Sequence, residues 1–169
     1  MSWMAEGHSN FMDSGILSSK LLSEGNKIHT FFGELSKDEF SKEIYSEGET
    51  WQIKDILAHL VSADINFLEY FKKLKSSGGG LPEEFDLNTF NNAQVNMMKS
   101  IKAKDLLEQF NENRNKMAIW VSQLKYEDLE LQGIHPAMGK AKLGEMIKMV
   151  YLHNILHLRD VKSVLSELR

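Results

Sequence analysis

Residues 152–161 read Leu-His-Asn-Ile-Leu-His-Leu-Arg-Asp-Val, and this stretch decides how the chain folds. His153 and His157 are four residues apart, so on an α-helix their rings stand one turn apart on the same face. Apolar residues at helical spacing share that face: Val150, Val161 and Val164. The stretch therefore predicts a long helix over about residues 143–168, with two imidazoles facing the protein interior.

A third histidine, His59, lies in the sequence Lys-Asp-Ile-Leu-Ala-His-Leu on a second predicted helix, about residues 51–74. Its neighbours on the apolar face of that helix are Ile56, Leu60, Ala63 and Phe67. A buried polar group without a partner costs about 1–3 kcal/mol, so three buried imidazoles need a common partner. We therefore predict one divalent metal ion with the ligands His59, His153 and His157.

Two further amphipathic stretches complete the predicted fold. Helical spacing of apolar residues predicts helices over about residues 15–35 and 89–124, the second interrupted near residues 100–105. No stretch alternates with period two, so no β-strand is predicted. The fold class is all-α, a four-helix bundle with long inter-helix connections. Residues 1–13 are expected to form an N-terminal arm and residues 14–169 a single domain.

A short recurrence suggests two related halves. Leu-Ser-Lys-Asp-Glu-Phe at residues 35–40 leads through a loop into the helix of His59, and Leu-Lys-Tyr-Glu-Asp-Leu at residues 124–129 leads into the helix of His153 and His157. Two such halves would place the three histidines near a pseudo-twofold centre.

Composition excludes several classes of protein. The chain has 24 acidic and 20 basic residues, a net charge of −4 and no basic block, which argues against nucleic-acid binding. It has no cysteine, so neither a thiolate metal ligand nor a thiol nucleophile is available. No apolar run is long enough for a signal peptide or a membrane span, and the cytoplasm is the expected location.

The histidine pattern narrows the kind of metal site. The zinc-protease pattern needs a glutamate directly after the first histidine of the pair, where this chain has Asn154. Three neutral nitrogen ligands leave a coordination position open, as in catalytic sites, and they suit zinc, nickel or iron(II). Core histidines satisfied by hydrogen bonds are the alternative.

Three other side chains are candidates for supporting roles. Asp55, one turn before His59, and Asp160, three residues after His157, can each accept a ring N–H and fix the tautomer of a ligand. Both are equally consistent with solvated helix residues. His135 lies in a connection, where a substrate contact and an ordinary loop position are both open.

Four motifs resemble the DinB/YfiT-like superfamily, metal-binding four-helix bundles that include bacillithiol and mycothiol transferases. The resemblance rests on Trp-x-x-Lys-Asp-x-Leu-x-His-Leu at residues 51–60, Phe-Asn at 90–91, Leu-x-x-Glu-Asp-Leu at 124–129 and Tyr-x-His-x-x-x-His at 151–157. Many members carry acidic residues where this chain has Asn154 and Leu156, so acid–base support beside the metal does not transfer.

The resemblance implies a metal-dependent enzyme that transfers a low-molecular-weight thiol to an electrophilic small molecule, and a homodimer. The sulfur would come from the cosubstrate, because the chain has no cysteine. A hydrolase that uses metal-activated water, and a non-catalytic stress protein that binds a metal or a small molecule, are the alternatives. No acid or base is assigned.

Overall fold

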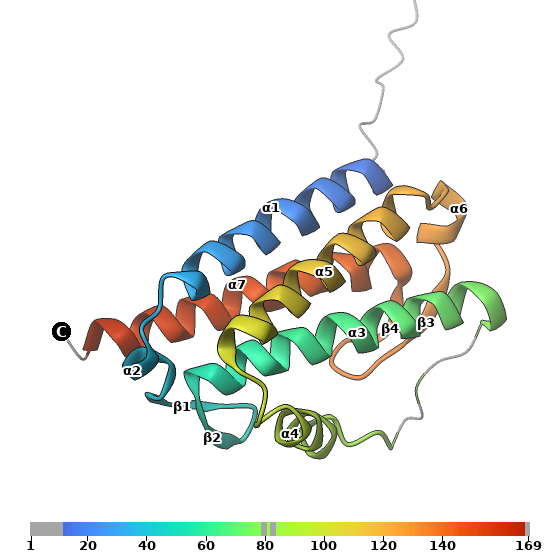
Figure 1. Ribbon diagram of the computed structural model, residues 1–169. Coiled ribbons are helices and arrows are strands. Elements are labelled where there is room, and N and C mark those ends of the chain that lie inside the picture. Colours follow the sequence, from blue (N-terminus) through green and yellow to red (C-terminus); the bar gives the residue numbers. More distant parts are fainter. Residues whose placement is uncertain (1–11, 79–80, 82–83, 168–169) are drawn as a thin grey trace, which may run out of the picture.

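Four long amphipathic helices bury their apolar faces against one another in the computed structural model, which describes residues 12–78, 81 and 84–167 (Figure 1). They are α1 (Ser14–Gly33), α3 (Ile53–Ser77), α5 (Ala103–Ser122) and α7 (Leu143–Glu167). Helix α1 contacts α5 and α7, and α3 contacts the same two helices, so α1 and α3 lie diagonally opposite. The predicted four-helix bundle is confirmed.

Two β-hairpins occupy the connections, and the prediction of no strands was wrong. The first connection contains α2 (Lys37–Phe40), β1 (Glu43–Ser46) and β2 (Glu49–Gln52); the second contains α6 (Tyr126–Leu129), β3 (Gln132–His135) and β4 (Gly139–Lys142). Each hairpin is an antiparallel pair of four-residue strands. Strands this short, with one face exposed, cannot show a sustained alternating pattern.

The two hairpins sit in equivalent places in the chain, as the recurrent motif suggested. In both halves a long helix leads through a short helix and a hairpin into a second long helix. The amide of Ile53 donates to the carbonyl of Lys42 at 2.9 Å, and the amide of Leu143 donates to that of Leu131 at 2.7 Å. These matching hydrogen bonds fix each hairpin against the first residue of the helix that follows it.

The boundaries of two predicted helices change. Helix α3 starts at Ile53 and not at residue 51, because Trp51 and Gln52 belong to β2. The predicted third helix divides into α4 (Leu87–Met97) and α5, which confirms an interruption. Helix α4 contacts α3 and lies across it, outside the bundle of long helices (Figure 1).

The core consists of two hydrophobic clusters, one toward each end of the bundle, with buried polar side chains between them. Each long helix contributes to this polar layer: Glu24 from α1, Asp64 from α3, Arg114 from α5, and Asn154 and His157 from α7. Along each long helix, these polar residues lie between the residues of one cluster and the residues of the other.

A buried ion pair lies in this layer. Arg114 donates from Nε and Nη2 to the two carboxylate oxygens of Asp64, both at 2.8 Å, and from Nη1 to the carbonyl of Leu21 at 3.2 Å. The side-chain oxygen of Asn154 accepts from Nη2 of Arg114 at 2.6 Å. Gly25 leaves room for the arginine, since a Cβ there would lie 2.7 Å from its Cγ. All four long helices therefore meet at one guanidinium.

Residues 1–11 lie outside the described residues, whereas Met12 packs against the core and Asp13 caps α1 by accepting from the amide of Ile16 at 2.9 Å. Within the described residues, no helix combines the length and apolarity that crossing a bilayer requires.

We expect Asp64→Ala to lower the free energy of unfolding by about 3–5 kcal/mol, because it leaves the Arg114 guanidinium buried without its counter-ion. Urea unfolding followed by circular dichroism measures this change. Asp160→Ala is the matched control: Asp160 pairs with Arg159 at 3.1 Å, but both side chains are largely exposed, and the loss should stay below about 1 kcal/mol. Equal effects of the two substitutions would contradict the structural role given to the buried pair.

Candidate metal centre

The three predicted ligand histidines converge at one point. His59 comes from α3, and His153 and His157 come from α7. The Nε2 atom of His153 lies 3.1 Å from that of His59 and 2.8 Å from that of His157. The ring planes are nearly perpendicular, with angles of 79°, 74° and 86° between pairs. The same nitrogen of each ring thus points to a shared centre.

A fourth side chain, Glu47, joins this cluster, although no sequence pattern had predicted it. Its Oε1 lies 3.8 Å, 3.9 Å and 3.4 Å from the Nε2 atoms of His59, His153 and His157, respectively. All four donor atoms lie within 4.8 Å of one another. Glu47 belongs to neither ligand helix: it stands in the turn between β1 and β2, which no helical pattern could reveal.

Backbone conformation places Glu47 at the centre. The turn residues Glu47 and Gly48 both have positive φ, 52° and 77°. Two consecutive residues in this region form the tight turn that suits a two-residue hairpin. Positive φ is uncommon for a residue with a side chain and is held here by the hairpin. The Glu-Gly pair between two short segments was the available sequence signal.

The protonation states suit a cation. Burial, followed by the neighbouring His153 and His157, lowers the pKa of His59 well below its ordinary value of 6.5, and burial also lowers that of His153. The neighbouring His153 and His157 lower the pKa of Glu47 far below its ordinary value. Neutral rings and an ionised carboxylate present lone pairs toward the same point.

The donor set fits a divalent metal ion. Ligand atoms at tetrahedral positions about 2.0–2.1 Å from one ion are about 3.3–3.4 Å apart. Five of the six separations among the four donor atoms run from 2.8 to 3.9 Å, and all six lie within 4.8 Å. Hydrogen bonds alone explain the cluster poorly. The Nε2 atom of His153 carries either one proton or one lone pair, yet two other ring nitrogens lie within 3.1 Å of it. Imidazole and carboxylate ligands suit zinc, nickel or iron(II).

The two aspartates expected to support the ligands have other partners. Asp55 accepts from the backbone amide of Gln52 at 2.9 Å and so caps the first turn of α3. Asp160 accepts from Arg159 at the surface. Among the described residues, neither carboxylate has a hydrogen bond or ion pair with a ligand ring. Their predicted role in orienting the histidines stays a prediction.

A cavity of about 380 Å³ opens beside the cluster. Glu47, His59 and His153 form part of its wall. The rest is largely aromatic and aliphatic, and includes Phe67, Phe85, Phe90, Leu81, Leu87 and Met149. Helices α3, α4 and α7 and the tips of both hairpins therefore enclose it. The geometry gives a small molecule access to the candidate metal centre.

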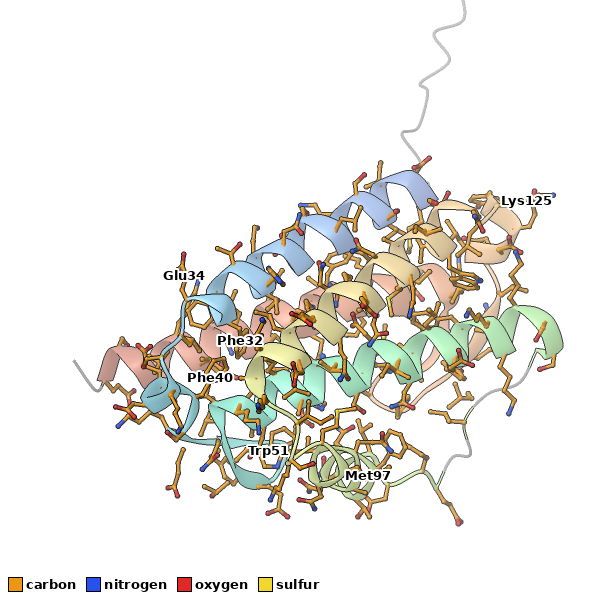
Figure 2. All side chains as sticks on the ribbon, viewed as in Figure 1. Phe32, Glu34, Phe40, Trp51, Met97 and Lys125 are labelled. Atoms are coloured by element: carbon orange, nitrogen blue, oxygen red, sulfur yellow. The ribbon has the colours of Figure 1, made fainter. Side chains whose placement is uncertain are left out.

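Trp51 links β2 to the helix that covers the cavity. Its indole N–H donates to the side-chain oxygen of Asn92 on α4 at 2.9 Å. The centroid of its ring lies 5.4 Å from the centroid of the His59 ring. Figure 2 shows Trp51 between the start of α3 and α4. Asn91, also on α4, donates to Oε2 of Glu47 at 3.5 Å. These contacts tie α4 to the cluster.

Comparisons with known proteins agree with this geometry. The family model of the DinB superfamily matches residues 23–161. No curated protein sequence matches the chain. Among solved structures, YfiT from Bacillus subtilis, described as a probable metal-dependent hydrolase with an unusual four-helix bundle topology, superimposes with a TM-score of 0.76 at 12% identity, covering 99% of this chain and 93% of that one.

A second solved structure shares the fold. A variant of mycothiol-dependent maleylpyruvate isomerase superimposes with a TM-score of 0.70 at 12% identity, covering 88% of this chain and 60% of the isomerase. At such low identity the two structures establish the bundle and nothing about the reaction. The family-model match spans most of the chain and includes all three histidines and Glu47. The chain therefore belongs to the DinB superfamily.

Proposed function

We propose that the protein is a cytoplasmic, metal-dependent enzyme that adds a low-molecular-weight thiol to an electrophilic small molecule. In this proposal His59, His153 and His157 hold one divalent cation. The observation that supports it is the convergence of three ring nitrogens and a carboxylate oxygen at the wall of a largely apolar cavity. The homodimer expected from the resemblance stays a prediction.

The bound cation would act as a Lewis acid and lower the pKa of a thiol or a water molecule beside it. The three neutral rings contribute no charge, and Glu47 contributes one negative charge. The carboxylate thereby offsets part of the cation's charge. Because its Oε1 lies within 4 Å of all three ring nitrogens, Glu47 can serve as a fourth donor, and a thiol or water molecule would then enter as a fifth ligand.

The chain cannot supply the sulfur itself, since it contains no cysteine. An external thiol would have to reach the cavity, where Glu47 and His153 meet the apolar wall. The aromatic and aliphatic side chains there favour an electrophile with a substantial apolar part. The fold shared with a mycothiol-dependent isomerase is consistent with a thiol cosubstrate.

A metal-dependent hydrolase is the second candidate, favoured by the fold shared with YfiT, a probable metal-dependent hydrolase. It would use the same ligands with water in place of the thiol. A protein that binds a metal or a small molecule without catalysis is the third. The three proposals share the metal centre and differ in what happens beside it.

We expect protein purified without a histidine tag to contain about one divalent ion per chain and His153→Ala to lose at least about 90% of it, because two ring nitrogens cannot replace three. Elemental analysis by mass spectrometry measures the ion, and circular dichroism should show unchanged helix content. His29→Ala, which removes a histidine of α1 outside the cluster, should retain the metal. Unchanged metal in His153→Ala would refute the ligand assignment.

Metal retention should persist down to about pH 6 and fall below it. Protons and the cation compete for the same ring nitrogens. Because burial lowers the pKa of His59 and His153 below 6.5, protons displace the cation at a lower pH than they would from free imidazole. Dialysis at pH 8, 7, 6 and 5 followed by metal analysis tests this. Loss of half of the metal at pH 7 or above would contradict the lowered pKa values of the buried rings.

Turnover distinguishes the candidates. We expect the metal-loaded protein to consume an electrophile such as monochlorobimane only when a low-molecular-weight thiol is added, and His153→Ala to lower that rate by at least about 100-fold. Ester and amide substrates without thiol form the parallel screen. Hydrolysis in that screen, with no thiol-dependent reaction, would favour the hydrolase. Bound metal with no turnover in either screen would favour the binding protein.

A further inference from the structure

His135, the last residue of β3, is a buried histidine outside the metal cluster. The residue is 2% exposed and forms part of the cavity wall that Glu47, His59 and His153 also line. It stacks on Phe67 of α3, with ring centroids 5.4 Å apart and planes 12° from parallel. It stands at the tip of the second hairpin, as Glu47 does at the tip of the first.

One hydrogen bond sets the tautomer of this ring. The backbone amide of Ala137 donates to Nδ1 of His135 at 3.1 Å. An accepting Nδ1 carries no proton, so in the neutral ring the proton is on Nε2. Burial, with a smaller contribution from His153, lowers the pKa of His135 to about 4, which keeps the ring neutral near pH 7. His135 is therefore a hydrogen-bond donor through Nε2.

Among the described residues, no atom accepts a hydrogen bond from Nε2 of His135, although this nitrogen is itself buried. An unsatisfied buried donor is costly, and native structures seldom keep one without a use. Its location on the cavity wall suggests that the use is a bound molecule.

The hairpin holds the ring in place. The hydroxyl of Tyr70 on α3 donates to the carbonyl of Ile134 at 2.6 Å, directly before His135. Gly133 allows β3 to pack closely against α3, because a Cβ there would lie 2.7 Å from the Tyr70 hydroxyl oxygen and 2.9 Å from Cδ1 of Leu74. With Phe67 on one face, the ring has little freedom to turn its donor elsewhere.

The cavity indicates the chemistry of the ligand. Its described wall contains no lysine or arginine, so away from the metal centre it offers an anion no cationic partner. Aromatic and aliphatic side chains dominate, and its volume of about 380 Å³ suits a molecule of small-drug size or less. A neutral oxygen acceptor on an otherwise apolar molecule matches one fixed N–H in such surroundings.

We propose that His135 is a ligand-binding residue that donates a hydrogen bond from Nε2 to an uncharged carbonyl-type oxygen of a largely apolar small molecule in the cavity. That this molecule is the electrophilic substrate rests on the proposed function; the binding site itself does not. Selectivity is the consequence: a site built to donate one hydrogen bond rejects analogues that lack the acceptor.

Two probes of nearly equal shape test this, acetophenone and ethylbenzene, which differ by the carbonyl oxygen. We expect the wild-type protein, as purified, to bind acetophenone at least about fivefold more tightly in ligand-observed NMR titrations. The Nε2–H resonance of His135 should shift on addition of acetophenone and not of ethylbenzene. Benzoate, the anionic analogue, should bind more weakly than acetophenone in His157→Ala, which lacks the complete metal centre.

Two conservative variants separate the ring's two nitrogens. In His135→Asn the amide occupies the Nδ1 position, so the Ala137 contact can persist while the donor is lost; the preference for acetophenone should disappear. In His135→Gln the amide reaches the Nε2 position, and part of the preference should remain. Metal content should be unchanged in both, because neither alters a proposed ligand.

The outcomes keep this proposal distinct from the metal-dependent reaction. The acetophenone preference should persist in His157→Ala, because His157 is a proposed metal ligand that is not among the residues lining the cavity; a missing metal or absent turnover would therefore refute the proposed function and leave the His135 site standing. An equal preference in His135→Asn would overturn the site, since the acceptor would then lie elsewhere, for example at the metal. If His135→Asn does not fold, the wild-type protein still provides a test. A His135 Nε2–H resonance that does not shift when acetophenone is added overturns the proposed site as well. Tighter binding of benzoate would overturn the uncharged ligand class.

Discussion

The arrangement of the bundle depends on one buried guanidinium. Arg114 of α5 binds Asp64 of α3, the carbonyl of Leu21 on α1 and the amide oxygen of Asn154 on α7. A charge in this position is tolerable only when every donor is satisfied, so the four helices must keep one mutual rotation and height. Asn154 lies on α7 between the two histidines. The network that orders the core therefore also fixes the helix that carries two of the three candidate ligands.

The same network gives a reason for one departure from the family pattern. The resemblance to the superfamily led us to expect an acidic residue at position 154, where this chain has asparagine. Here the guanidinium already has a full counter-charge in Asp64, which is 1% exposed. A second buried carboxylate would add an uncompensated negative charge, whereas the neutral amide accepts from Arg114 and donates to the carbonyl of Val150. The change alters how the core is held together and leaves the ring nitrogens in place.

Repetition of a helix–hairpin–helix unit explains how the site and the cavity share a wall. Each half of the chain ends its connection with a hairpin whose tip reaches the groove between α3 and α7. The first tip delivers a carboxylate, Glu47, to the ring nitrogens; the second delivers an imidazole, His135, to the apolar side of the cavity. One scaffold thus presents two polar groups with different uses, a donor atom for a cation and an N–H for an oxygen.

The sequence by itself determined the four long helices and three convergent histidines, because helical spacing places His59, His153 and His157 on faces that must be buried, and buried imidazoles need a partner. Only the tertiary structure decided the rest. Glu47 and His135 lie in hairpins whose four-residue strands carry too short a pattern to recognise, and their roles arise from contacts across more than 60 residues of chain. Asp55, which spacing placed one turn before His59, accepts from the backbone amide of Gln52, a capping contact that the residue spacing alone did not reveal.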